Sequence, residues 1–513
     1  MLMRRILLFI LLSVFTALCC TTSCVHKPQV AVVPVDGDYP DSVAKIILNK
    51  CINAGCHNQA SYETSTPGLL LDTWAHLFNG SIYGAEVIAY NTKYSPLLYY
   101  LNAGYDSTIV NLYDPHHIDT PHSLNRAEYY TLKNWIASGA PDKNGNIPFA
   151  SNSDTRQKIY LTISGCNLVA VIDAKSRVIM RLVPVGTYPG NESIHDIEVS
   201  GDGKYAYVSF YSGKLLQKID TKTDTVVGSV NLGSVITGGA GNWSIVYLSP
   251  EDTAVMVSGM IANGAAVTTN TSTMQINNNL SLDNINFGTS PLVSPHGIAS
   301  NATFDTFFVT LEYGNIVDRF TFNGPLGFYS KYISINGSGP TATNNGTTPD
   351  PHQIEMAPDF SKYFVTCQNT NEVRVIDAYT NAVLDSIPVG TKPQEMALSE
   401  SKQYLFVVCM EDGANTTPNA RGSVYIIDYN TDKVVKILYG DFYQPHDIAI
   451  DETDGLLFIN STNQNPSGPA PHHVSACGGR DGWYTIYDLN TLLPDGKRYE
   501  AGVFPYAISA RFK

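Results

Sequence analysis

The chain has 513 residues, a formal net charge of −14 at pH 7 and only 15% charged residues. An acidic, weakly charged surface argues against a nucleic-acid partner, because proteins hold the phosphate backbone with clustered lysines and arginines. The length exceeds that of one ordinary compact core, so the chain predicts either two domains or a repeat architecture.

The N-terminal segment has the features of an export signal. Two positive charges within the first five residues precede an apolar run of thirteen residues from Ile6 to Leu18. Thirteen residues are too few to span a bilayer, so the run predicts a secretory signal rather than a membrane helix. Thr22 and Ser23 lead into Cys24, which predicts a lipoprotein-type signal peptide over residues 1–24 with lipidation at Cys24. Plain secretion is the alternative.

Residues 25–40 are rich in valine, proline and glycine and predict a tether. The sequence contains no other long apolar run, so the expected membrane attachment is through the lipid alone. We therefore expect an exported protein that is lipid-anchored in the bacterial cell envelope, in the periplasm or at the outer membrane.

Residues 41–148 have a helical pattern. One helix is predicted over 42–48 and another over 126–137, followed by the stop signals Gly139 and Pro141. Large apolar residues recur in the second helix at helical spacing: Tyr130, Leu132, Trp135 and Ile136. The pattern predicts a small all-α domain.

A Cys-x4-Cys-His motif lies in this region, at Cys51, Cys56 and His57. Two cysteines can form thioethers to a porphyrin, and a histidine next to the second one can bind the iron, as in c-type haem attachment. The usual spacing has two residues between the cysteines, whereas four separate them here. The alternative is a disulfide between Cys51 and Cys56, with His57 incidental.

The second axial ligand of such a haem cannot be a methionine from this region, because no methionine occurs between Met3 and Met180. Histidines at 116, 117 and 122 precede the last predicted helix, and we favour His117 over His122 and His116. Two-histidine ligation predicts a lower reduction potential than His/Met ligation. The alternative is that these are exposed loop histidines beside an open or water-bound iron.

This region resembles the small cytochrome c-like domains of exported bacterial proteins. The matching segments are Cys51–His57, Gly68–Trp74 and Leu132–Ala140. The chain departs from that family in its cysteine spacing and in having Thr120-Pro121 where the family often has Met-Pro. The resemblance implies a covalent haem c and a redox partner protein in the cell envelope.

From residue 158 onward, short Val/Ile/Tyr/Phe runs alternate with Gly/Asn/Asp/Thr turns, an all-β pattern. A repeat underlies it, in which fourteen residues separate a first-strand residue from the residue, usually small and polar, that closes the second strand. Copies begin at six positions: His195, Ser244, His296, His352, Gln394 and His446. Four strands in each repeat of 42–60 residues predict the blades of a β-propeller.

The two ends of this region complete one further blade. Residues 158–186 supply three strands without a first strand, and residues 504–509 supply one. The sequence therefore predicts a mainly β chain, with a seven-bladed propeller over 158–513 after the helical domain. The repeat resembles the YVTN family of β-propellers, whose motif reads Pro-His-x-hydrophobic-x-hydrophobic-Ser-x-Asp-x-Lys-Tyr-x-Tyr-Val. That resemblance implies the fold and says little about function.

The first residues of the inner strands should gather at one mouth of the propeller channel. Four of these residues are histidines: His195, His296, His352 and His446. Converging neutral imidazoles could bind copper or another transition metal, and the alternative is structural histidines bonded to nearby backbone. The long loop 463–482, with His472 and His473, is expected to overhang this mouth.

We expect an exported haem-c electron-transfer protein with a propeller that serves as an interaction or redox domain. One alternative is a non-redox binding lipoprotein with a Cys51–Cys56 disulfide. Another is a metal-dependent oxidoreductase centred on the propeller histidines. The sequence identifies no catalytic residue, so it leaves open whether the protein is an enzyme.

Overall fold

The computed structural model describes residues 36–52, 55–118, 120–187, 190–235, 242–259, 265–281, 294–324, 327–343, 345–473 and 475–512. The predicted signal peptide and the lipidation site Cys24 lie outside the described residues. Within the described part, no helix is both long and apolar enough to cross a bilayer.

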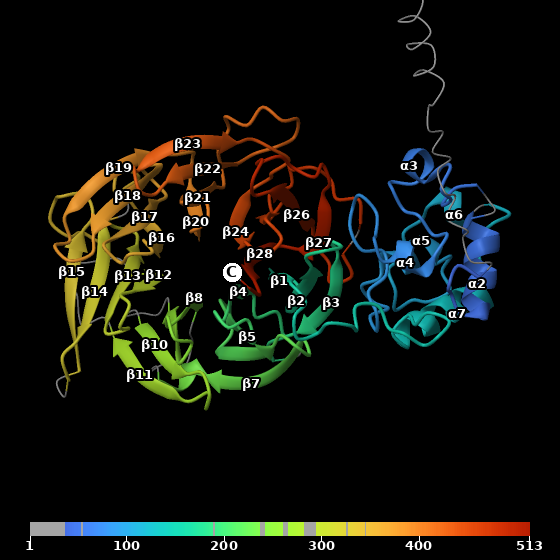
Figure 1. Cartoon of the computed structure of the whole chain (residues 1–513), viewed down its shortest axis with the longest axis horizontal. Helices are drawn as coiled ribbons and strands as arrows, with labels where there is room; N and C mark the ends of the chain where they lie inside the picture. Colours follow the sequence, from blue (N-terminus) through green and yellow to red (C-terminus); the bar gives the residue numbers. More distant parts are fainter. Residues whose placement is uncertain are drawn as a thin grey trace, which may run out of the picture.

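Helices are concentrated in the N-terminal region, which lies beside the propeller (Figure 1). They are α2 (Asp41–Ile47), the π-helical segment η1 (Leu48–Ile52), α3 (Tyr62–Ser65), α4 (Trp74–Leu77), α5 (Pro96–Leu101), α6 (Pro115–Ile118) and α7 (Arg126–Ala137). Most of them are only one or two turns long, and irregular loops connect them. That this region is a cytochrome c-like domain stays a prediction.

Helix α7 has the predicted bounds. A capping box closes its start, since the side chain of Asn125 accepts from the Glu128 N–H and the Glu128 carboxylate accepts from the Asn125 N–H. Gly139, with φ +100°, follows its end. The buried face includes Tyr129, whereas the predicted Tyr130 is half-buried and its hydroxyl donates to the Tyr105 carbonyl.

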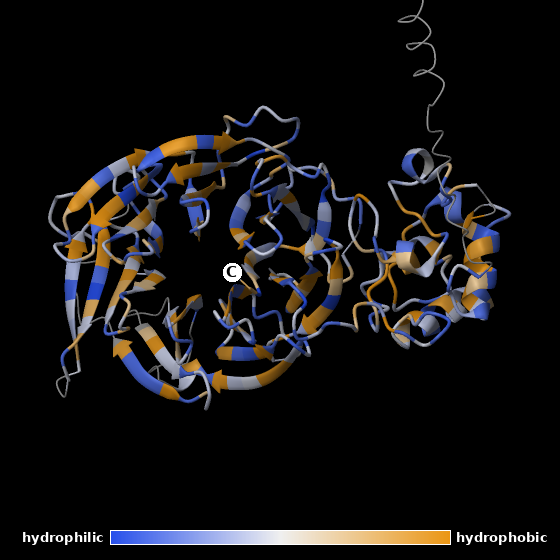
Figure 2. Ribbon diagram, viewed as in Figure 1, coloured by the Kyte–Doolittle hydropathy of each residue, from blue (hydrophilic) through white to orange (hydrophobic). Residues whose placement is uncertain are grey.

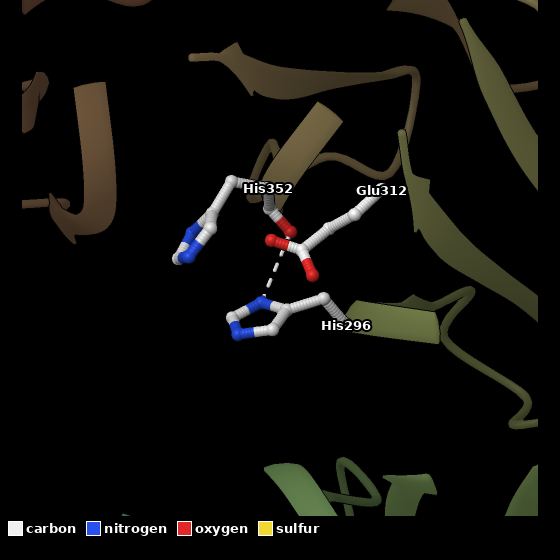
Figure 3. Close-up of side chains that lie close together, drawn as sticks. All are labelled: His296, Glu312 and His352. Carbon is white, nitrogen blue, oxygen red and sulfur yellow. Dashed lines mark hydrogen bonds between the residues drawn. The ribbon is translucent and has the colours of Figure 1, made fainter. Parts of the chain in front are cut away.

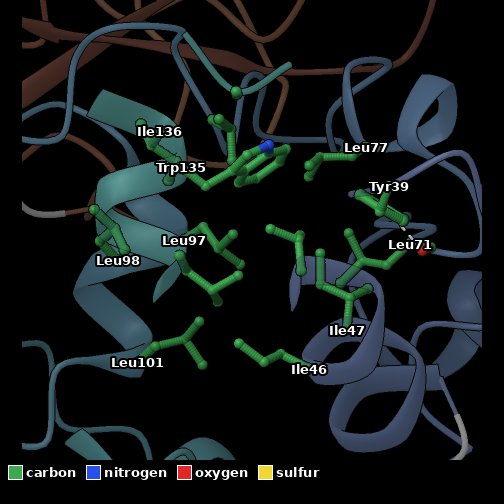
Figure 4. Packing of buried hydrophobic residues seen from close by; sticks show 14 of the residues in the cluster. Tyr39, Ile46, Ile47, Leu71, Leu77, Leu97, Leu98, Leu101, Trp135 and Ile136 are labelled. Carbon is green, nitrogen blue, oxygen red and sulfur yellow. Dashed lines mark hydrogen bonds between the residues drawn. The ribbon is translucent and has the colours of Figure 1, made fainter. Parts of the chain in front are cut away.

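The core of the N-terminal region forms where α2 and α7 meet α5 (Figure 4). Ile46 and Ile47 of α2 pack with Leu98 of α5 and Ile136 of α7. A second apolar contact joins this region to the propeller, because Ile88 is buried in a cluster with residues of the first propeller sheet. The helical region is thus continuous with the propeller rather than set apart from it.

In the described residues, twenty-eight strands form seven four-stranded antiparallel sheets. The first contains β28 (Pro505–Ala510), β1 (Lys158–Ile163), β2 (Leu168–Asp173) and β3 (Ile179–Pro184). The next two contain β4 (Ile194–Val199), β5 (Tyr205–Phe210), β6 (Leu215–Asp220) and β7 (Thr225–Asn231), then β8 (Trp243–Leu248), β9 (Ala254–Gly259), β10 (Ala265–Asn270) and β11 (Ile276–Ser281). A 3-10 helix, η2 (Leu232–Val235), follows β7.

The remaining four sheets follow in chain order. Two contain β12 (Ser294–Ser300), β13 (Thr306–Glu312), β14 (Ile316–Phe322) and β15 (Phe328–Ser334), then β16 (Pro351–Met356), β17 (Lys362–Cys367), β18 (Glu372–Asp377) and β19 (Val383–Pro388). The last two contain β20 (Pro393–Ser399), β21 (Tyr404–Cys409), β22 (Ser423–Asp428) and β23 (Lys433–Leu438), then β24 (Pro445–Asp451), β25 (Leu456–Ser461), β26 (Asp481–Asp488) and β27 (Tyr499–Val503).

The sheets are the blades of a seven-bladed propeller, as predicted (Figure 1). The last strand, β28, pairs antiparallel with β1 and so closes the ring with the two ends of the β region. Strands β1 and β2 are buried at every position, whereas the outer strand β7 alternates exposed and half-buried residues. Apolar residues accordingly line the strands more than the loops (Figure 2). This pattern arises because neighbouring blades cover both faces of the inner strands.

The fourteen-residue spacing of the repeat has a structural cause. The side chain that closes the second strand of one blade donates a hydrogen bond to the carbonyl of the ring residue in the next blade. The donor and acceptor pairs are Ser258 to His296 at 2.6 Å, Thr310 to His352 at 2.6 Å and Asn460 to Tyr506 at 2.7 Å. These bonds satisfy buried carbonyls and connect these three blades to their neighbours at the propeller centre.

Candidate haem site and propeller centre

The Cys-x4-Cys-His motif begins at the end of η1. Cys51 packs against the N-terminal core, Cys56 is exposed, and both are thiols rather than partners in a disulfide. The main-chain N–H of His57 donates to the Cys51 carbonyl at 3.3 Å, so a hydrogen bond holds the two ends of the motif together. Burial raises the pKa of the Cys51 thiol to about 12.

His57 is a buried imidazole held in one tautomer. Its Nδ1 lies 3.1 Å from the Leu69 carbonyl, which can only accept, so Nδ1 carries the proton and Nε2 keeps its lone pair. Burial lowers the pKa of His57 to about 4, against the opposing effect of the bond to Leu69. The ring is therefore neutral near pH 7, which is the form that binds a metal.

His117, from the short helix α6, lies next to His57. The ring centroids are 6.1 Å apart and the ring planes are inclined by 34°. The Nδ1 of His117 donates to the Asp114 carboxylate at 2.7 Å. In the neutral ring its Nε2 therefore keeps a lone pair, as the Nε2 of His57 does. His116 and His122 are exposed side chains, so the structure brings the favoured histidine of the three to His57.

The two rings are spaced as a shared metal requires. With metal–imidazole bonds of about 2.0–2.1 Å, two rings at this separation would be able to hold one metal ion between them. In each ring the other nitrogen bonds a carbonyl or a carboxylate, the usual outer partner of a metal-binding histidine. The donor set of His57, His117, Cys51 and Cys56 thus fits a covalently attached haem.

The long loop 463–482 lies against the N-terminal region. His472 stacks on Tyr83 with centroids 4.0 Å apart, and Tyr100 bonds its Nδ1 at 2.9 Å. The prediction that these histidines overhang the propeller mouth is therefore wrong. His472 packs instead against the aromatic side chains of Tyr83 and Tyr100 in the N-terminal region. Such a contact leaves no periodic pattern in the sequence, so it could not be predicted.

His473 anchors the same loop among carboxylates. Its Nδ1 lies 3.1 Å from Glu500, and its Nε2 lies 3.8 Å from Glu86 of the N-terminal region. Desolvation would lower the pKa of His473, but the bond to Glu500 and the charge of Glu86 outweigh it and raise that pKa. Burial raises the pKa of Glu86 as well.

A disulfide between Cys166 and Cys477 ties the loop to the first blade. Its two cysteines are 311 residues apart, and the sequence offered no signal for pairing them. The loop therefore has covalent, ionic and aromatic contacts that connect the propeller with the helical region.

The four predicted histidines do converge at the propeller centre. Successive ring centroids are 5.3 Å apart for His195 and His296, 3.9 Å for His296 and His352, and 6.1 Å for His352 and His446. Tyr506 completes the circle, 3.7 Å from His446 and 4.9 Å from His195. All four histidines are buried, and whether they bind a metal stays a prediction.

Burial keeps these rings neutral. It lowers the pKa of His296 to about 4 and that of His446 to about 3, and it lowers the pKa of His195 and of His352 well below the ordinary value. Two rings also bond backbone, as the alternative anticipates: the Nδ1 of His296 to the His352 carbonyl at 3.3 Å and the Nδ1 of His446 to the Tyr506 carbonyl at 3.1 Å.

Two carboxylates that the sequence analysis did not identify stand beside the histidines. Figure 3 shows Glu312 pointing toward His296 and His352. Glu395 also lies near His352, with an Oε1–Nδ1 distance of 3.6 Å. Burial raises the pKa of Glu312 to about 7 and raises that of Glu395 well above its ordinary value. Glu395 directly follows the ring residue Gln394, a signal that could have found it.

No protein-family model matches the chain, and no curated protein matches it. A solved structure of a functionally unknown protein from Desulfotomaculum acetoxidans is similar, with 13% identity, a TM-score of 0.51, and coverage of 69% of this chain and 98% of that one. Hydrazine synthase from Kuenenia stuttgartiensis follows with 16% identity, a TM-score of 0.46 and coverage of 63% and 92%. Dihydro-heme d1 dehydrogenase NirN, in complex with DHE, has 14% identity, a TM-score of 0.45 and coverage of 77% and 88%. At such identities the likeness concerns the fold alone.

Proposed function

We propose that the protein is an exported electron-transfer protein with a covalent haem c in its helical region. The observation that carries the proposal is the pair formed by His57 and His117, whose centroids lie 6.1 Å apart. Each ring has its Nδ1 engaged and its Nε2 available for an axial bond. Cys51 and Cys56 would form the thioethers, and the haem, when bound, supplies one-electron chemistry.

The residues around the pair perform the protein's part of this function. The Leu69 carbonyl and the Asp114 carboxylate accept from the Nδ1 atoms, so they orient the two rings and leave the Nε2 atoms to hold the iron. Two neutral imidazoles favour a lower potential than a His/Met pair, which suits an electron donor or relay.

The propeller would either exchange electrons with the haem or bind a partner protein of the cell envelope that does so. Ring contacts run from His117 to Tyr100 and on to His472 of the propeller loop, with centroids 5.8 Å apart at each step. This path supports coupling between the haem region and the propeller.

The direct test is the absorption spectrum of the full-length protein exported from cells with a working haem-attachment system. We expect a pyridine haemochrome spectrum and a covalent haem mass in the wild type. Both should be lost in the double variant Cys51→Ala/Cys56→Ala and kept in Cys367→Ala, which removes a buried propeller thiol.

A colourless wild-type protein would reject the haem proposal. Mass spectrometry of the peptide around Cys56 then tests the non-redox alternative, because a disulfide with Cys51 removes two hydrogens. The sequence motif and the thiol state of both cysteines favour haem over that alternative.

We also propose that a lipid on Cys24 anchors the protein in the cell envelope. The variant Cys24→Ala should move the protein from the detergent phase to the aqueous phase on phase partitioning, because the acyl chains supply the membrane affinity. Unchanged partitioning of the variant would contradict the anchor.

A further inference from the structure

The propeller centre holds buried polar atoms that lack a hydrogen-bond partner. Among the described residues they include the Nδ1 of His352, the Oε1 of Glu395 and the Nε2 of His446. These side chains are 4%, 5% and 2% exposed, so bulk solvent does not reach them. Native proteins rarely leave such atoms unpaired, and an unfilled ion site is one physical explanation for them.

The same three residues form one group of potential ligands. Each offers a ligand atom, and these atoms lie within 4.8 Å of one another. The Nδ1 of His352 and the Oε1 of Glu395 are 3.6 Å apart. Small side-chain movements would bring all three atoms to bonding distance of one cation.

Hydrogen bonds from neighbouring groups already orient two of the three ligands, His446 and Glu395. The Nδ1 of His446 donates to the Tyr506 carbonyl at 3.1 Å, which leaves its Nε2 lone pair directed to the centre. The Gln353 amide donates to the second oxygen of Glu395, which leaves Oε1 available. The carbonyl of His352 accepts from Thr310 at 2.6 Å, which fixes the strand that carries this ligand.

We propose that His352, Glu395 and His446 bind one divalent transition-metal ion at the propeller centre. Two imidazoles and one carboxylate suit zinc, iron(II) or copper(II), and they leave coordination positions open for water or substrate. This site is separate from the haem site and does not depend on it.

A neighbouring group, His296, Glu312 and His352, is the rival ligand set. Its atoms are better satisfied, because the Nδ1 of His296 bonds the His352 carbonyl and Glu312 accepts from Ser294 at 3.1 Å and from Gln368 at 3.2 Å. The unpaired atoms therefore favour the set with Glu395 and His446.

An open cavity of about 560 Å³ lies near the propeller centre, since Glu312 is one of its lining residues. Three carboxylates and one lysine are among its lining residues: Glu312, Asp350, Glu411 and Lys392. An acidic lining raises the local concentration of cations. The lining residue Gln368 accepts a hydrogen bond from Gln394, the residue before Glu395, at 3.2 Å.

The test uses the full-length protein, stripped with a chelator and titrated with Zn²⁺. We count zinc by mass spectrometry and measure affinity by calorimetry, so iron in a haem does not enter the result. We expect one tightly bound zinc per wild-type chain. In Glu395→Gln and His446→Gln the affinity should fall by more than the ~10–100-fold typical of outer-shell changes.

Glu312→Gln is the matched control, because it neutralises the neighbouring carboxylate and should keep wild-type affinity. Wild-type affinity in Glu395→Gln and His446→Gln, or loss in Glu312→Gln alone, would overturn the assignment. Should the variants fail to fold, the wild type still decides the question. Zinc must raise its melting temperature, and X-ray absorption must show two imidazoles in the zinc shell. Absence of either result overturns the proposal.

Discussion

At the scale of single residues, the haem proposal depends on which nitrogen of each ring carries a proton. Leu69 and Asp114 accept from the Nδ1 atoms of His57 and His117, so both Nε2 atoms remain available. A carbonyl or carboxylate cannot donate, and this elementary fact determines the tautomers.

The role of His117 as a haem ligand can be tested by comparison with His122. In the haem-loaded protein, His117→Ala should replace a six-coordinate, low-spin absorption spectrum with that of an open or water-bound iron, because one axial imidazole is removed. The change is checked by absorption and by binding of an added ligand such as imidazole. His122→Ala, which alters an exposed histidine, should leave the spectrum unchanged. The opposite pattern would make His122 the ligand.

At the scale of elements, the propeller blades are joined by side chains at the ends of their second strands. Thr310 both donates to the His352 carbonyl at 2.6 Å and accepts from the Gly297 N–H at 2.7 Å. The repeat in the sequence therefore reflects a recurring hydrogen bond between blades as well as the alternation of buried and exposed residues along the strands.

Removing that hydroxyl should destabilise the propeller. Thr310→Val keeps the shape but leaves the buried Gly297 N–H without its partner and the His352 carbonyl with only the longer bond from His296, a cost of about 1–3 kcal/mol. The midpoint of urea unfolding should fall in Thr310→Val and change much less in Thr310→Ser, which keeps the hydroxyl. Equal midpoints in Thr310→Val and the wild type would show that the bond between blades contributes nothing measurable.

At the scale of the whole molecule, a buried ionic cluster joins the helical region to the propeller. Glu86 comes from the first part of the chain, and His473 and Glu500 come from the last blade. Burial raises the pKa of the Glu86 carboxyl, because the charged form is less well solvated in the folded protein than in the unfolded chain.

This cluster predicts a pH dependence of stability. A carboxyl whose pKa is raised on folding stabilises the fold below its ordinary value of 4.5, and this contribution is lost as the pH rises through the folded value. Glu86→Gln removes the titration, so its unfolding midpoint should fall less than that of the wild type between about pH 5 and pH 8. The exposed-site variant Glu63→Gln should follow the wild type. A Glu86→Gln curve parallel to the wild-type curve would contradict the prediction.

Much of the architecture could be predicted because it leaves a periodic or adjacent pattern in the chain. The bounds of α7, the four-strand repeat and closure by β28 follow from spacing alone, and so does the convergence of His195, His296, His352 and His446. Adjacency likewise marked Cys56 and His57, since neighbours in the chain are neighbours in space.

Folding in three dimensions decided the rest. The disulfide from Cys166 to Cys477 and the contact of His472 with Tyr83 join segments hundreds of residues apart, through loops that follow no repeat. Glu312 and Glu395 reach the histidines only because blades pack side by side, and the direction of a side chain depends on that packing. The sequence determines the helices, strands and repeats, because these depend on residues close together in the chain. Contacts across the ring form only when the seven blades pack into the closed propeller.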